Sequence, residues 1–129
     1  MKDIHVPISP GELLDKITIL RIKAARISDP AKLHNVRLEL ELLEHTWRDS
    51  GAAVPAVAED EAKLQQVNEA LWDIEDQIRD KERARQFDAE FIELARAVYV
   101  TNDERAAAKK RINTTLGSRI VEEKSYQPY

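Results

Sequence analysis

Residues 9–27 read SPGELLDKITILRIKAARI, and apolar side chains fall on more than one side of this segment when it is drawn as a helix. Ser9 is a favoured N-cap, Pro10 suits the first helical position, and Glu12 completes a capping-box pattern. A helix that is apolar on more than one side needs cover on each of them. We therefore expect residues 9–27 to form the centre of an all-α antiparallel helical bundle.

Two further long helices follow in the predicted order. Asp29 and Pro30 open the second helix, which runs to about Ser50 and stops at Gly51. A loop over residues 52–58 leads to the third helix, which starts near a cluster of acids at position 59. Three long N-terminal helices are therefore expected.

The C-terminal half predicts one or two more helices. The apolar pattern of the third helix fails between residues 79 and 86, and Asp88 is placed to cap a fourth helix. A second capping-box pattern at 101–104 leaves two alternatives open, a break near residue 101 or one continuous helix to residue 116. With an extended leader over residues 1–8 and a tail over 118–129, the whole chain forms one helical domain.

Coiled-coil-like packing is predicted by apolar residues that alternate steps of three and four in the first three helices. The three sets are Leu13, Ile17, Leu20, Ala24 and Ile27; Leu33, Val36, Leu40, Leu43 and Trp47; and Leu64, Val67, Leu71, Ile74 and Ile78. If these helices are antiparallel neighbours, the sets align in five layers with one residue from each helix. Leu40 then lies in the middle layer.

A second stripe on the first helix predicts an interface. It consists of Asp15, Ile19, Ile22 and Arg26, on the side away from the five layers. A second copy packed antiparallel would place Ile19 against Ile22 and Asp15 against Arg26, which suits a two-fold homodimer. The alternative is that the fourth helix of the same chain covers this side, with Phe91, Leu94 and Val98.

The composition excludes several classes of protein. The 129 residues include no Cys, and 20 basic residues against 24 acidic ones give a net charge of -4, which disfavours general nucleic-acid binding. No apolar run approaches the roughly 20 residues that a membrane helix needs, and the N-terminus lacks the apolar segment of a signal peptide. We expect a cytoplasmic protein that binds neither nucleic acid nor membrane.

No catalytic or metal-binding motif is present. Glu41 and His45 lie one turn apart, but His34 is about 16 Å from His45 along a helix, and no His-Glu-x-x-His or Glu-x-x-His pattern occurs. Neither a phosphate-binding glycine loop nor a Gly-x-Ser-x-Gly elbow is found. We therefore predict no metal, no cofactor and no catalytic residues.

One basic segment is the best candidate for an anionic ligand. Arg105 and Lys109 share a helical face, with Tyr99 nearby in sequence, and Lys16 or Arg21 of the first helix are further candidates. A phosphate or carboxylate would pair with these cations. The alternative is a solvated basic half of a helix, which complements the helix dipole.

Three stretches carry a resemblance across nearly the whole chain. They are SPGELLDKITILRIK at residues 9–23, DPAKL and NVRLEL at 29–33 and 35–40, and TNDERA, KRIN and VEEKSY at 101–106, 110–113 and 121–126. Together they resemble an uncharacterised family of small bacterial helical proteins, a domain of unknown function. The resemblance implies no activity.

Two functions follow from these observations. The first is a non-enzymatic helical interaction or scaffold protein that works as a homodimer or with another protein partner. The alternative is a small anionic-ligand binder, or an unrecognised enzyme, that uses the basic C-terminal helix. A concave site where the cations converge would favour the alternative.

Overall fold

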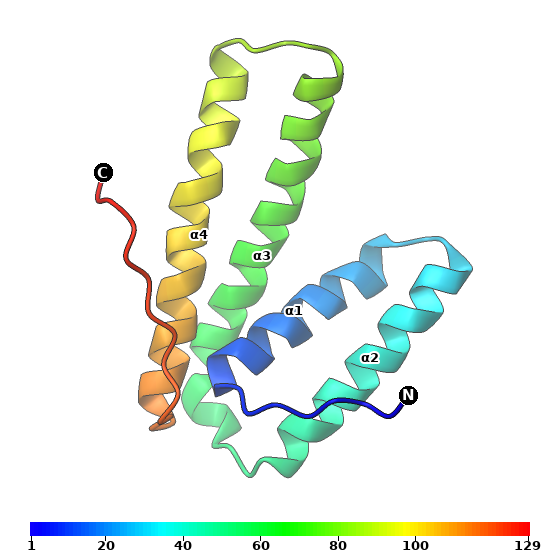
Figure 1. Ribbon diagram of the computed structural model, residues 1–129, viewed down its shortest axis with the longest axis vertical. Coiled ribbons are helices and arrows are strands. Elements are labelled where there is room, and N and C mark those ends of the chain that lie inside the picture. The colour runs from blue at the N-terminus through cyan, green and yellow to red at the C-terminus, as the bar shows by residue number, and fades with distance from the viewer.

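The computed structural model describes residues 1–129 and contains four helices and no strand. The helices are α1 (Pro10–Arg26), α2 (Pro30–Asp49), α3 (Val54–Arg83) and α4 (Ala89–Thr115). They form two antiparallel hairpins, α1–α2 and α3–α4, which share a base and diverge from it (Figure 1). The all-α antiparallel bundle is therefore confirmed. None of the four helices has the length and apolar character that crossing a membrane requires.

Three of the helices begin where their capping residues predict. The Ser9 hydroxyl accepts a hydrogen bond from the amide of Glu12 at 3.2 Å, and Asp29 accepts one from the amide of Lys32 at 3.0 Å. Asp88 caps α4 in the same way. Each side-chain oxygen satisfies an amide that has no partner within the helix, so these residues fix the helix starts.

One predicted boundary changes, and the helix limits in the C-terminal half agree with the sequence. The helix expected to start near residue 59 begins at Val54, because Pro55 falls in the first turn, where its missing amide costs nothing. The side chain of Val57, assigned to a loop from the sequence, is fully buried. The fourth helix runs without a break through position 101, and α3 ends at Arg83, beside a left-handed residue, Arg85 (φ 55°).

The apolar core lies at the base, where both hairpins meet. It consists of Leu13, Leu14, Ile17, Trp47, Val57, Leu64, Ala108 and Ile112. All four helices contribute to this set, and α1 contributes the most residues. The expectation that α1 is the central helix is thus confirmed.

The predicted five layers across the first three helices are wrong in one respect. α2 packs along α1 but not along α3 or α4, while α3 packs mainly along α4. The physical reason is that α1 lies between α2 and the α3–α4 hairpin and fills the place where α2 and α3 would meet. Leu40 and Leu43 therefore reach the edge of the core and stay partly buried.

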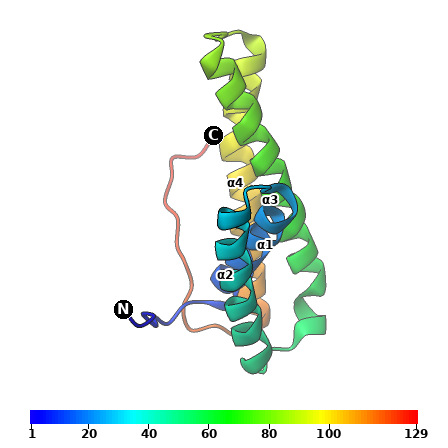
Figure 2. The same cartoon turned by 90° about the vertical axis from the view of Figure 1, so that its right-hand side faces the viewer.

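The upper part of the α3–α4 hairpin extends beyond α1. From residue 69 to residue 107 no side chain is fully buried, because beyond the end of α1 the two helices cover mainly each other. The C-terminal tail turns back and runs in the direction of the upper end of the hairpin (Figure 2). The centre of the Tyr129 ring lies 5.2 Å from that of Tyr99 on α4. The hairpin thus has a packed base and an open upper end.

Two equal truncations test the position of the core. Leu64→Ala should lower the free energy of unfolding by roughly 2–5 kcal/mol, because the Leu64 side chain is fully buried. Leu40→Ala should cost less than half as much, since Leu40 lies at the edge of the core. Urea unfolding of both variants measures the difference, and equal losses would contradict this placement of α2.

Candidate functional site

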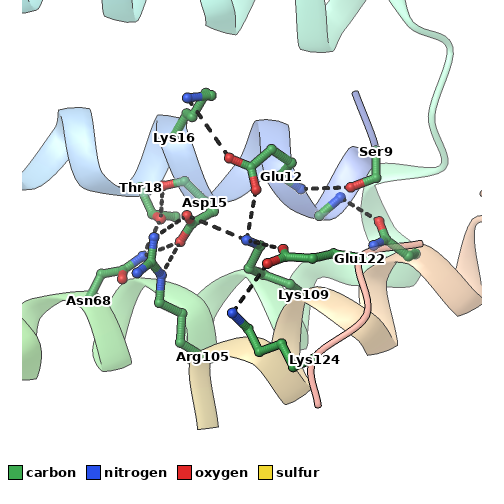
Figure 3. A network of polar contacts seen from close by, with 12 residues as sticks. Ser9, Glu12, Asp15, Lys16, Thr18, Asn68, Arg105, Lys109, Glu122 and Lys124 are labelled. Atoms are coloured by element: carbon green, nitrogen blue, oxygen red, sulfur yellow. Dashed lines mark hydrogen bonds and ion pairs between the residues drawn. The ribbon is translucent and has the colours of Figure 1, made fainter. Parts of the chain in front are cut away.

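The most unusual group of side chains surrounds Asp15, whose exposed fraction is only 2%. The Arg105 guanidinium donates two hydrogen bonds to this carboxylate, from Nε to Oδ1 at 2.8 Å and from Nη2 to Oδ2 at 2.5 Å. The Asn68 amide donates to Oδ1 of Asp15 and to Oγ1 of Thr18, both at 3.0 Å. These side chains come from α1, α3 and α4 and converge on one point (Figure 3). We call this group and its immediate neighbours the polar junction.

A second ion-pair cluster adjoins Asp15. The Lys109 ammonium lies 2.7 Å from a Glu12 oxygen, 2.9 Å from a Glu122 oxygen and 4.0 Å from Asp15 Oδ2. Glu122 belongs to the C-terminal tail, so Lys109 joins α1, α4 and the tail. Lys124 also lies near Glu122, at 3.2 Å.

Close contact between α1 and α4 brings the charges together. The amide of Gly11 donates to Oδ1 of Asn113 at 2.7 Å. A Cβ atom on Gly11 would lie 2.5 Å from the carbonyl oxygen of Lys109. Only glycine lets the two backbones approach so closely. Asp15 and Thr18 lie one and two turns after Gly11 on the same helix, so this contact brings them near α4.

The charges at the junction stabilise one another. Burial alone would raise the pKa of Asp15, but the hydrogen bonds from Arg105 and Asn68, with the charges of Arg105 and Lys109, hold that pKa below its ordinary value. The hydrogen bond to Asp15 raises the pKa of Arg105. Burial disfavours the charged form of Lys109, but Glu12 and Glu122 raise its pKa overall. Asp15, Arg105 and Lys109 are therefore charged near neutral pH.

The arrangement is suited to holding helices together. Every buried side-chain nitrogen and oxygen has a hydrogen-bond partner, and no group of three acidic or histidine side chains is placed to hold a metal ion. Shifted pKa values occur at active sites and also in ion-pair networks that support a fold. Here each cation already faces carboxylates of its own chain, which favours the supporting role.

The structure brings together only part of the predicted ligand site. Arg105 and Lys109 lie side by side in the junction, and Lys16 is 3.9 Å from Glu12 at its edge. Arg21 points elsewhere and pairs with acids of α2 and α3. Tyr99 lies on the exposed part of α4 against the tail. The five residues do not form one concave site.

The predicted two-fold stripe on α1 faces the chain's own helices. Asp15 and Ile22 are buried, and Ile19 is half-buried. Arg26 forms an ion pair with Asp73 of α3, and its guanidinium lies 5.9 Å from the centre of the Trp72 ring. The four residues do not form an exposed surface, since α3 and α4 cover this side of α1. The cover does not come from Phe91, Leu94 and Val98, as the alternative expected, because these residues lie on the part of α4 that extends beyond α1.

Three members of the junction were not singled out from the sequence. They are Thr18, Asn68 and Glu122. A usable signal existed for Asn68, which lies one turn after Leu64 on an otherwise apolar side of its helix. Glu12 was noted only as a capping residue, but its carboxylate turns to Lys109, and only its amide takes part in the cap.

The comparison with protein families covers nearly the entire molecule. The model described as Family of unknown function (DUF6165) matches residues 4–129. The chain belongs to this family. The matched region contains all four helices, the polar junction and the tail. No curated protein and no solved structure matches the chain. Membership in DUF6165 thus covers nearly the whole chain and assigns no activity to it.

Removing the charge of Asp15 should destabilise this DUF6165 protein. Breaking a buried ion pair costs roughly 3–5 kcal/mol, and we expect about 2–3 kcal/mol for Asp15→Asn, because Arg105 keeps 31% of its side-chain surface in water. Urea unfolding at neutral pH measures the loss. Asp76→Asn, at an exposed acid without an ion-pair partner, is the control and should change little.

The same variant tests the lowered pKa of Asp15. A carboxyl group with a lower pKa in the folded state adds stability above its unfolded pKa, about 3.9, and loses it as the pH falls through the folded value. The stability difference between wild type and Asp15→Asn should therefore be full at pH 5–7 and shrink below about pH 4. A difference that grows on acidification would contradict the direction of the shift.

Gly11→Ala should also weaken the junction. The added methyl group meets backbone at 2.5 Å, so α1 and α4 must move apart, at a cost of about 1–3 kcal/mol. Thermal unfolding should show a lower midpoint for this variant than for Ala25→Gly, a change at an exposed position of the same helix. An unchanged midpoint would show that the contact between α1 and α4 is loose.

Proposed function

We propose that this DUF6165 protein is a non-enzymatic helical interaction module. Its packed base supports the upper part of the α3–α4 hairpin, which binds a protein partner. The open part is residues 69–104, between Asn68 and Arg105 of the junction, and we call it the arm. Its partner-binding role is the function that the geometry supports best.

The observation that carries this proposal is that no further helix covers the apolar residues of the arm. Apolar residues follow helical spacing along both helices, and all of them are only partly buried: Leu71, Ile74 and Ile78 on α3 and Phe91, Leu94 and Val98 on α4. At the tip, Phe87 and Ile92 are 54% and 55% exposed. In helical bundles such seams are normally covered by further helices. Apolar surface left uncovered on a soluble protein commonly marks an interaction site.

The base gives the arm a firm support. α3 and α4 are continuous from the core into the arm, and the junction ties both helices to α1 just below it. Arg26 adds a contact at the lower end of the arm, through Asp73 and Trp72. A preorganised surface loses little conformational freedom on binding, which favours affinity.

The alternative function, binding of a small anion, has less support. Arg105 and Lys109 are paired with carboxylates of the same chain. A shallow groove of about 170 Å³ between α4 and the tail contains Lys110 and Lys124, but Glu122 and Glu123 line it as well. The acids there compete with any anionic ligand for the same cations.

A surface change at the tip tests the proposed function. Phe87→Ser with Ile92→Ser removes exposed apolar surface and should leave the unfolding midpoint nearly unchanged. The protein purified from the cells that make it should lose its bound partner with these changes. The matched control is Leu38→Ser with Leu42→Ser, which removes similarly exposed leucines from α2 and should keep the partner.

Two results would contradict the proposal. In the first, the tip variant and the α2 variant both retain the same partners as the wild type. The other is a robust thermal shift of the wild type with phosphates or carboxylates, without any bound protein. Light scattering on the purified wild type shows in addition whether the partner is a second copy of the chain.

A further inference from the structure

A buried asparagine lines the groove between α4 and the C-terminal tail. Asn113 is only 2% exposed, and its Oδ1 atom accepts a hydrogen bond from the amide of Gly11 at 2.7 Å. That bond identifies the side-chain oxygen, so the other end of the group is the Nδ2 amide. Nδ2 forms no hydrogen bond within the chain, although every fully enclosed side-chain nitrogen has a partner. Its N–H groups must therefore reach a surface, and the groove that Asn113 lines provides it.

Helix geometry accounts for the two environments of this side chain. Lys109 lies on the side of α4 that faces α1, because it pairs with Glu12. At 3.6 residues per turn, Asn113 lies about 40° further round α4 and Lys110 about 100° further. The tail contacts α4 beyond them, at Asp103, about 120° round from Lys109. Asn113 is thus placed between α1 and the tail, with one end of its amide group for each.

Two charged side chains of the groove have no partner. Glu122 lies 2.9 Å from the Lys109 ammonium and 3.2 Å from that of Lys124, so these three charges satisfy one another (Figure 3). Lys110 and Glu123 line the same groove, and neither forms an ion pair. The groove therefore offers one free cation, one free anion and the donor group of a buried amide.

The size of the groove limits what it can hold. Its volume is about 170 Å³, below the roughly 300–1,000 Å³ of sites that hold drug-sized ligands. Ala106 and Ala107 supply the apolar part of its lining. A matching ligand is small, carries a positive and a negative charge close together, and has a small apolar group. An α-amino acid has all of these features.

The tail wall of the groove is held in place by the chain itself. Glu122 is fixed by Lys109, and the Tyr129 hydroxyl donates a hydrogen bond to Asp103. The hydrogen bond from Lys109 also lowers the pKa of Glu122, so this contact persists at neutral pH. Glu123 lies between the two attachment points. A wall that is already in position loses little conformational freedom when a ligand binds.

From these observations we propose that the groove between α4 and the tail binds a small α-amino acid as its zwitterion. The Lys110 ammonium pairs with the carboxylate of the ligand, and Asn113 donates a hydrogen bond to the same carboxylate. Glu123 accepts hydrogen bonds from the ligand's ammonium group. A simple anion does not suit the groove, because Glu123 would repel it. The groove lies outside the arm, so this proposal goes beyond the proposed function and does not rest on it.

Three related compounds test the chemistry of the ligand. L-alanine carries both charges, N-acetyl-L-alanine lacks the ammonium group, and L-alanine amide lacks the carboxylate. Heteronuclear NMR of the nitrogen-labelled full chain should show that L-alanine shifts the side-chain amide signal of Asn113 and the backbone signals of residues 120–124, and not those of α2. Each of the other two compounds should bind roughly tenfold more weakly, because it leaves one charged group of the groove without a partner.

Single charge removals test the two ends of the site. Lys110→Gln and Glu123→Gln should each weaken binding of L-alanine roughly tenfold. Both should keep the unfolding midpoint of the wild type, because neither side chain forms an ion pair. The matched controls are Lys32→Gln and Glu39→Gln, at exposed positions of α2, which should leave binding unchanged.

Asn113→Asp tests the buried amide separately from the charges. The variant keeps an oxygen for the amide of Gly11 and replaces the Nδ2 donor with a second oxygen. It should therefore remain folded by circular dichroism and lose binding of L-alanine. Binding equal to that of the wild type would overturn the assignment of Asn113.

Three further results would overturn the proposal. One is the absence of any shift at Asn113 with L-alanine in the millimolar range. Another is equal binding of the three compounds, and the third is equal weakening by the groove variants and the α2 controls. None of these results bears on the arm, whose function is tested by the cellular partner and the tip variant.

Discussion

The ion pair between Asp15 and Arg105 determines how the two hairpins are placed relative to each other. It joins residues 90 positions apart in the sequence, and the carboxylate is almost completely buried. A buried ion pair is not always more stable than an apolar contact of the same size, but losing one partner leaves an uncompensated charge. Asn68 and Thr18 complete the hydrogen bonds around the carboxylate. The pair therefore excludes other registers of α1 on the hairpin.

This constraint explains why the molecule has a packed base and an open arm. α1 has only 17 residues, whereas α3 and α4 have 30 and 27. Once Asp15 is fixed near Asn68 and Arg105, α1 reaches its end near Asp73, and the hairpin above must continue without it. Because α2 packs on α1 alone, it does not cover the upper arm either. The uncovered surface follows from helix length and register together.

The sequence predicts the helices well because their signals are local. Ser9, Asp29 and Asp88 cap helices where expected, and the two-sided α1 is indeed central. The pairing of α2 with α3 was wrong because matched spacing shows which residues share a side, and not which helix lies opposite. The same limit affects the site: Arg105 and Lys109 were recognised as important cations, but their carboxylate partners on α1 are about 90 or more residues away. Only the fold shows that these charges satisfy one another.

The acids of α3 have two different environments. In the lower half, Glu61 and Asp73 face Arg21 and Arg26, so the attraction between α1 and α3 offsets the repulsion among the acids. Further up α3, the repulsion between Asp76 and Asp80 has no such compensation from another helix. The pair of Asp76 and Asp80 itself adds no stability to the isolated chain, because like charges one turn apart weaken a helix.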